Sequence, residues 1–210
     1  MKKIIFATGN ANKMVEVRMI LADCGYEIVS MKEAGIDIDI VEDGKTFEEN
    51  AIIKATAISK TKEAEGCVVL ADDSGLEVDY MDGAPGIYSA RFANIEIHGD
   101  ECVDNEKNAD DEDNNNLLLE KLQGVAESDR TAYYVCAISC IFPDGKEISV
   151  RGECHGIIGF ERDGNAGFGY DPLFIINGKS FGKYEGEEKD KISHRGKALR
   201  SLAEELKKII

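Results

Sequence analysis

The chain has 210 residues and a formal net charge of −16 at pH 7. Such an acidic composition argues against general binding to a nucleic-acid backbone, which requires clustered lysine and arginine. The hydrophobic fraction is ordinary for a folded globular protein, and no apolar run in the sequence is long enough to cross a bilayer. We expect neither nucleic acid nor membranes as partners; a small anionic ligand would need a local basic cluster, a divalent cation or both.

The N-terminal part predicts alternating strands and helices. Residues 4–7 are apolar and predict a strand that ends at Thr8-Gly9-Asn10. Apolar residues then recur at helical spacing from Met14 to Cys24, and Gly25 is placed to end that helix. Residues 26–30 predict a second strand. This order of strand, turn, helix and strand indicates an α/β protein.

A second helix and a third strand follow. Thr46 and Glu49 have the spacing of a capping box. The strand predicted for residues 67–71 runs into Asp72-Asp73-Ser74-Gly75, which we interpret as its end. Ligands gather at the carboxyl ends of strands in α/β sheets, so both polar strand ends are candidate sites. One face of the second helix is apolar: Phe47, Ala51, Ala55 and Ile58.

The second half of the chain is less regular. Residues 94–116 are rich in Asp, Glu and Asn and are interpreted as an exposed loop, and residues 117–122 start or continue a helix. Residues 132–142 predict a long strand, which a Pro-Asp-Gly turn connects to another strand at residues 147–154. The chain closes with an amphipathic helix whose apolar positions are Ala198, Leu199, Leu202, Leu206 and Ile209.

The six cysteines form no Cys-x-x-Cys pair, so zinc and thioredoxin-like chemistry have little support. We predict free thiols, buried or half-buried, in a reducing cytoplasm. The cysteines are Cys24, Cys67, Cys102, Cys136, Cys140 and Cys154.

Two polar groups follow predicted strands. The segment from Thr8 to Lys13 opens a helix, whose N-terminus offers unpaired N–H groups and a positive dipole end to a phosphate. Taken alone, a plain turn capped by Asn10 is the simpler interpretation. Asp72 and Asp73 must point in opposite directions, because successive side chains alternate along a strand. One can face a phosphate ligand together with Mg²⁺ while the other braces the loop, or both can belong to an ordinary Asp-rich turn.

Three further groups carry the same ambiguity. Asn50 and Lys54 share one helix face, or Lys54 is an ordinary solvated lysine. The glycines around Phe168 let backbone and ring approach a flat ligand, and Asp171 can bind a base edge, or the Phe is simply packed in a turn. Ser193-His194-Arg195-Gly196 offers donors to a phosphate or keto oxygen, or is a helix cap with surface basic residues.

Taken together, these groups resemble the XTP/dITP diphosphatase family, also called inosine triphosphate pyrophosphatases. The blocks occur in the family's order and reach from one end of the chain to the other. They are Phe6-Ala7-Thr8-Gly9-Asn10-x-x-Lys13, Phe47-x-x-Asn50-Ala51-x-x-Lys54-Ala55, Ala71-Asp72-Asp73-Ser74-Gly75-Leu76, Gly83-Ala84-Pro85-Gly86-x-Tyr88-Ser89-Ala90-Arg91, Gly167-Phe168-Gly169-Tyr170-Asp171-Pro172 and Ser193-His194-Arg195-Gly196.

The resemblance implies an α/β fold with a long mixed central sheet. Residues 1–210 would form a single catalytic domain of two lobes, with the active site in the cleft between them. The implied reaction is Mg²⁺-dependent hydrolysis of ITP, dITP and XTP to the monophosphate and pyrophosphate, which cleanses the nucleotide pool. The implied assembly is a homodimer. Residues 94–116 are longer than the resemblance leads us to expect, but they lie outside the motifs.

The resemblance also implies roles for particular residues. Asp73 matches the proton acceptor and a magnesium ligand, Glu42 matches a second magnesium ligand, and Lys54 faces the phosphates. Arg195 is the best candidate donor to the 6-keto oxygen, which adenine lacks. The residues implied to bind substrate are Thr8, Gly9, Asn10, Ala11, Asn12 and Lys13 for the triphosphate, and Ser74, Phe168, Gly169, Tyr170, Asp171, Lys189, His194 and Arg195 for other parts of the nucleotide.

Two alternatives stay open at this point. A catalytically silent nucleotide-binding module would keep the basic residues and lose the acids, and the presence of both Asp73 and Glu42 argues against it. A pyrophosphatase of the unrelated type that acts on pyrimidine or modified nucleotides would be separated by a panel of substrates.

Overall fold

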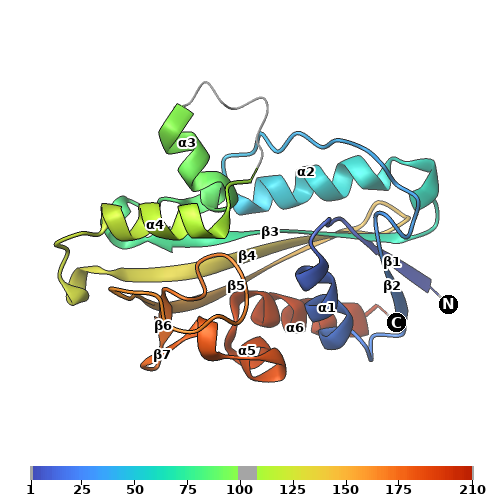
Figure 1. Ribbon diagram of the computed structural model, residues 1–210. Coiled ribbons are helices and arrows are strands. Elements are labelled where there is room, and N and C mark those ends of the chain that lie inside the picture. Colours follow the sequence, from blue (N-terminus) through green and yellow to red (C-terminus); the bar gives the residue numbers. More distant parts are fainter. Residues whose placement is uncertain (1, 99–107, 210) are drawn as a thin grey trace. The chain divides into compact units, whose positions relative to one another are not determined.

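The computed structural model describes residues 2–98 and 108–209 (Figure 1). Its seven strands form a sheet in the order β2-β1-β3-β4-β5-β6-β7, with parallel pairing of β1 to β2 and β3 and antiparallel pairing of β6 to β5 and β7. The strands are β1 (Lys2–Phe6), β2 (Tyr26–Ser30), β3 (Val68–Val78), β4 (Thr131–Ile141), β5 (Glu147–Ile158), β6 (Phe174–Ile176) and β7 (Lys179–Ser180). The α-helices are α1 (Ala11–Ile20), α2 (Phe47–Ser59), α3 (Phe92–His98), α4 (Asp111–Lys121), α5 (Gly186–Ile192) and α6 (His194–Lys207). The predicted α/β fold with a mixed sheet is confirmed.

The described residues group into two compact units. Unit 1 comprises Met1–Ser74, Cys136–Glu153 and Asp190–Ile210, and unit 2 comprises Gly75–Val135 and Cys154–Lys189. The single catalytic domain and its cleft stay predictions. No helix within residues 2–98 and 108–209 is both long enough and apolar enough to span a membrane.

Side chains of β1 and β3 alternate between two apolar clusters in unit 1. The even-numbered residues of both strands, such as Phe6 and Leu70, pack with the apolar faces of α1 and α6. The odd-numbered residues, such as Ile5 and Val69, pack with α2. Because side chains alternate along a strand, this pattern directs Asp72 towards α1 and α6 and Asp73 towards α2.

The predicted end of the third strand is wrong. β3 runs through Asp72 and Asp73 to Val78, so both carboxylates lie within the strand. Asp, Ser and Gly are poor strand formers, but burial of the following residues overrides that preference. Leu76 and Val78 are completely buried, and the Leu76 N–H donates to Ser89 Oγ at 2.8 Å.

The exposed loop predicted for residues 94–116 is wrong where α3 and α4 enter it, whereas residues 108–110 do lie outside any helix or strand. α3 extends to His98 and α4 begins at Asp111, while residues 99–107 lie outside the described residues, as does Cys102. Three acidic residues in the first turn of α4 favour its start, because they lie at the positive end of the helix dipole. Asn114 ties α4 to the preceding segment by accepting from the Ala93 N–H at 2.9 Å.

Other boundaries shift by a few residues. The predicted strand at residues 26–30 is confirmed as β2. α1 ends at Ile20 because a turn follows, in which the Cys24 N–H donates to the Leu21 carbonyl at 3.0 Å. β5 continues beyond residue 154 to Ile158, and α6 ends at Lys207, which leaves Ile209 in a turn and 38% exposed. The five described cysteines are free, as predicted, and only Cys67 among them is half-buried.

Candidate active site

The N-terminus of α1 is shaped by its own polar residues. Asn10 is the N-cap, and its Oδ1 accepts from the N–H groups of Asn12 at 2.9 Å and Lys13 at 3.3 Å. Thr8 Oγ1 accepts from the Asn10 N–H at 3.1 Å, which fixes the turn before the helix. The local structure is therefore the Asn-capped turn of the simpler interpretation, and phosphate binding by this segment, including Gly9 and Ala11, stays a prediction.

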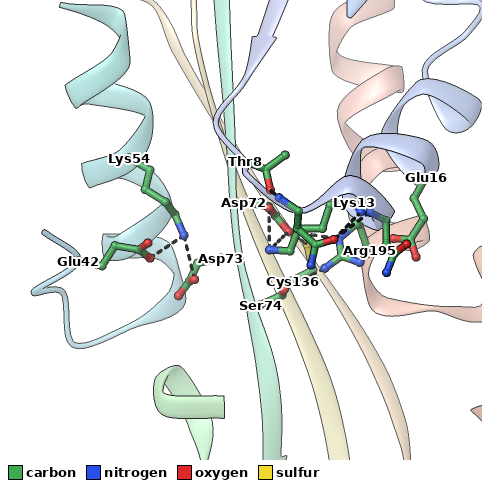
Figure 2. Close-up of polar contacts among 12 residues, drawn as sticks. Thr8, Lys13, Glu16, Glu42, Lys54, Asp72, Asp73, Ser74, Cys136 and Arg195 are labelled. Carbon is green, nitrogen blue, oxygen red and sulfur yellow. Dashed lines mark hydrogen bonds and ion pairs between the residues drawn. The ribbon is translucent and has the colours of Figure 1, made fainter. Parts of the chain in front are cut away.

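Asp72 anchors a basic cluster on the side of β3 that faces α1 and α6 (Figure 2). Lys13 Nζ lies 3.0 Å from each carboxylate oxygen of Asp72, and Arg195 Nε donates to Oδ2 at 3.2 Å. The Asp72 side chain is only 1% exposed. Burial alone would raise its pKa, but the charges of Lys13 and Arg195 outweigh burial and hold the pKa below its ordinary value. Asp72 is therefore a permanent anion that holds two cations.

Arg195 is buried at the start of α6. Its Nη1 donates to Glu16 Oε2 at 2.6 Å and its Nη2 donates to Ser74 Oγ at 3.0 Å. Ser193 caps the helix by accepting from the Gly196 N–H at 3.0 Å. His194 and Arg195 are both buried, so the expected helix cap is present but these two residues are not surface basic residues.

Asp73 belongs to a second cluster on the α2 side of the strand, as Figure 2 shows. Lys54 Nζ donates to Asp73 Oδ1 at 3.0 Å and to Glu42 Oε2 at 2.6 Å. Asn50 Nδ2 donates to Asp73 Oδ2 at 3.3 Å, while Asn50 Oδ1 accepts from the Gly44 N–H at 2.9 Å. The loop that carries Glu42 is thus tied to Asp73 through two residues of α2, and Lys54 is not a solvated surface lysine.

Burial makes Asp73 a weaker acid than its neighbour. Burial raises its pKa, the positive charge of Lys54 opposes that effect only in part, and Glu42 raises the pKa further. Burial lowers the pKa of Lys54, but Asp73 and Glu42 outweigh it and raise the pKa above the ordinary value. Lys54 therefore stays protonated, and the Asp73 carboxylate beside it is more basic than usual, which suits Asp73 to accept a proton.

In unit 2, the glycine-rich loop gathers a third set of predicted residues. Asp171 Oδ2 accepts from the Phe168 N–H at 2.8 Å and from Lys189 Nζ at 2.6 Å. Lys189 Nζ also lies 5.3 Å from the centre of the Phe168 ring. A Cβ on Gly167 would clash with the Asp171 carboxylate, and the φ of +81° at Gly167 also favours glycine. Glycine is therefore favoured at this position, since another residue would strain the backbone and displace the Asp171 carboxylate.

The rest of this loop is held from two directions. Tyr170 is buried, and its hydroxyl donates to the Ser89 carbonyl at 2.8 Å, which is a structural contact. The Gly169 N–H donates to Asp111 Oδ2 at 2.6 Å, and the Gly169 carbonyl accepts from Asn115 Nδ2 at 2.9 Å. Substrate binding by Gly169 and Tyr170 stays a prediction.

Unit 1 thus brings together Lys13, Ser74 and Arg195 around Asp72, and unit 2 brings together Phe168 and Lys189 with Asp171. Sequence reasoning missed the contacts of Glu16, Asp111 and Asn115, and it saw Asn50 without its role. A signal existed for Glu16, which lies three residues after Lys13 and so shares its helix face. The residues missed in these clusters are Glu16, Asp111, Asn115 and Cys136, whose Sγ lies 3.9 Å from Asp72 Oδ2.

Within residues 2–98 and 108–209, no group of three or more His, Cys, Asp or Glu side chains is arranged to hold a metal ion. Glu42 and Asp73 instead form a pair of carboxylates that share the Lys54 ammonium.

Comparison with known proteins identifies the family. The model of the Ham1 family matches residues 4–205. A protein named dITP/XTP pyrophosphatase from Clostridium perfringens is 46% identical over 215 residues and covers 100% of both chains. The solved structure of the Staphylococcus aureus Ham1 protein has a TM-score of 0.83 and 38% identity and covers 100% of both chains. A HAM1 protein from Coxiella burnetii has a TM-score of 0.82 and 34% identity, with coverage of 99% of this chain and 100% of that chain. The chain belongs to the Ham1 family, and the resemblance inferred from its motifs is confirmed.

Proposed function

We propose that this protein hydrolyses the non-standard purine nucleoside triphosphates ITP, dITP and XTP to the monophosphate and pyrophosphate, and so cleanses the nucleotide pool. The observation that carries the proposal is the buried Lys54 ammonium between the carboxylates of Asp73 and Glu42, at 3.0 and 2.6 Å. The family supports it, because the similar protein from Clostridium perfringens is named a dITP/XTP pyrophosphatase.

The reaction needs a proton acceptor and a cationic surface for the phosphates. Asp73 accepts a proton from a water molecule while the water oxygen bonds to the α-phosphorus, and the bond to the pyrophosphate leaving group breaks. A carboxylate whose pKa is raised by burial is a better base than an exposed one. Lys54 and Lys13 neutralise developing charge on the phosphates, so that positioning and electrostatics supply most of the acceleration.

The carboxylate pair fits a magnesium ion. Oxygens of Glu42 and Asp73 lie 2.6 and 3.0 Å from the Lys54 Nζ, so the two carboxylates are near each other and Lys54 supplies only one positive charge for the two of them. In phosphate-processing sites Mg²⁺ uses one or two protein carboxylates, several waters and substrate phosphate oxygens, so a third protein ligand is not required. We propose that Glu42 and Asp73 hold Mg²⁺, which when bound would neutralise phosphate charge.

The remaining predicted residues bind the substrate in this proposal. The α1 N-terminus from Thr8 to Lys13 takes phosphate oxygens, since helix N-termini favour anions. Phe168 stacks on the base, and Asp171 with Lys189 supports that ring. Residues 1–210 would act as one catalytic domain of a cytoplasmic homodimer, an assembly that sedimentation of the purified protein tests.

A panel of triphosphates tests the proposal. Pyrophosphate release is measured for ITP, dITP, XTP, ATP, GTP and two pyrimidine triphosphates, with Mg²⁺ and with a chelator. The Asp73→Asn variant, purified in the same way, controls for contaminating hydrolases. We expect fast release from the first three substrates, with Mg²⁺ only. Preference for a pyrimidine triphosphate would instead favour the alternative class of pyrophosphatase, and no release from any substrate would refute an enzymatic role.

A further inference from the structure

Side chains of α4 hydrogen-bond to both the backbone N–H and the backbone carbonyl of Gly169 in the glycine-rich loop. The Gly169 N–H donates to the Asp111 carboxylate at 2.6 Å, and the Gly169 carbonyl accepts from the Asn115 amide at 2.9 Å. Asp111 and Asn115 are four residues apart, so they project from the same face of the helix. These three residues all belong to unit 2.

The orientation of the Asn115 amide is fixed by two acceptors. Its Nδ2 donates to the Asp111 backbone carbonyl at 2.7 Å as well as to the Gly169 carbonyl. A rotated amide would place its oxygen against two carbonyl oxygens, which would repel it. Asn115 is buried, and its contacts therefore specify one geometry.

These contacts set the backbone on one side of Phe168. The peptide between Phe168 and Gly169 is planar, so holding the Gly169 N–H fixes the plane that follows the Phe168 Cα. On the other side, the Phe168 N–H donates to Asp171 Oδ2 at 2.8 Å. Gly169 has a φ of +63°, which a glycine adopts without strain. Because glycine adopts many other conformations as readily, hydrogen bonds from other residues are needed to fix this one. The carbonyl of the same peptide, that of Phe168, accepts from the Asp171 N–H at 3.4 Å, so α4 and Asp171 together hold the backbone that carries the Phe168 ring.

We propose that Asp111 and Asn115 are positioning residues that hold Phe168 in the orientation in which it stacks on the base of the substrate. The inference rests on the proposed function, because it concerns the same substrate. It draws Asp111 and Asn115 from residues 94–116, the acidic segment that the sequence places outside the catalytic motifs. In the alternative, both residues only stabilise unit 2.

A double-mutant cycle between Asp111 and Phe168 separates these two roles. Asp111 is exposed, so Asp111→Ala should fold. We expect Phe168→Ala to lower kcat/KM for ITP by about 5- to 100-fold, the range of base–aromatic stacking. Asp111→Ala alone should lower it by about 3- to 10-fold, mainly through KM, as expected for one lost hydrogen bond. In the Phe168→Ala background the second substitution should cost less than about twofold, because coupled residues are not additive.

Two further variants and one measurement sharpen the test. Asp113→Ala removes an equal charge from the same helical turn and should leave kcat/KM unchanged. Asp111→Asn keeps an acceptor oxygen for the Gly169 N–H and should restore most of the activity. In nucleotide-free protein, the Gly169 amide proton should exchange faster with solvent in Asp111→Ala than in Asp113→Ala.

The outcomes are distinguishable. If the wild type releases no pyrophosphate from any triphosphate, the proposed function fails and the role in stacking fails with it. If the wild type is active but Asp111→Ala has the same effect with and without the Phe168 ring, the positioning role alone is refuted. Unchanged exchange of the Gly169 amide would refute the contact on which the role depends.

Discussion

Substituting each aspartate of the Asp72-Asp73 pair by Asn tests the site most directly, because one chemical change is made in two opposite environments. The Asp72 carboxylate is 1% exposed and pairs with Lys13 and Arg195. Removing one partner of a buried ion pair costs about 3–5 kcal/mol, and the lower end, about 3 kcal/mol, applies here because Asn keeps an acceptor oxygen and Lys13 is only partly buried. At roughly 2–4 °C per kcal/mol for a chain of this size, Asp72→Asn should lower the Tm by about 6–12 °C.

Asp73→Asn should behave in the opposite way. Burial raises the pKa of Asp73, so its ionisation opposes folding at neutral pH, and removal of the charge should leave the Tm unchanged or higher. Its activity should nevertheless collapse, because loss of a general base costs about 100- to 10,000-fold in kcat. Asp72→Asn should therefore lose more stability than Asp73→Asn but far less activity.

The pH dependence of the two variants has opposite signs. The folded-state pKa of Asp72 is lowered, so its contribution is complete above its unfolded pKa of about 3.9 and declines as the pH falls below that value. The wild type and Asp72→Asn should therefore converge in Tm as the pH falls below about 4. The folded-state pKa of Asp73 is raised, so the wild type gains stability relative to Asp73→Asn as the pH falls through it.

The assays are thermal unfolding from pH 3 to 8 and pyrophosphate release from saturating ITP with Mg²⁺. Near-normal kcat in Asp73→Asn would remove Asp73 from the mechanism. An unchanged Tm of Asp72→Asn at pH 7 would show that the ion pairs of Asp72 contribute no net stability, and the electrostatic reasoning would be wrong.

Three further predictions concern the substrate. Lys13→Ala and Lys54→Ala should each lower kcat/KM for triphosphates, and steady-state kinetics with unchanged values in both variants would rule out a shared phosphate site. Exhaustive chelation should abolish pyrophosphate release and Mg²⁺ should restore it, whereas full activity in the chelated protein would contradict a metal requirement. Arg195→Ala should reduce the preference for ITP over ATP by about 10- to 100-fold, as expected for one polar contact to a base edge, while Phe168→Ala should weaken both substrates. An equal loss for both substrates in Arg195→Ala would place the guanidinium on the phosphates instead.

Local pattern predicted most of the elements but not all of their ends. The spacing of apolar residues predicted the positions of β1, β2 and α2 well, because packing against one face of the core requires apolar residues at regular intervals. The first turns of α4 were not predicted, because they are rich in Asp and Asn, whose preference for turns hides the helix until Leu117. Asp, Glu and Asp in succession at residues 111–113 were the available signal, since acidic residues favour a helix N-terminus.

The partners of the charged residues could not be predicted in the same way. Alternation along β3 already separates Asp72 from Asp73, but it does not say which cations each one meets. Arg195 and Glu16 are 179 positions apart in sequence and touch because α6 returns to α1 beside the parallel pair β1 and β3 (Figure 1). Such a pairing follows from the order of strands in the sheet, which no local motif encodes.

The difference between the two aspartates also supports the division of work that we propose for unit 1. Asp72 is buried and Asp73 is largely buried, so burial alone would raise the pKa of each. Two cations from separate helices meet Asp72 and outweigh burial, whereas Asp73 shares its one lysine with Glu42. A carboxylate that must hold cations benefits from a low pKa, and one that must take a proton benefits from a raised pKa. Adding a second cation beside Asp73 would give it an environment like that of Asp72. The added cation should lower the pKa of Asp73 and so weaken it as a base, even though the new ion pair would stabilise the fold.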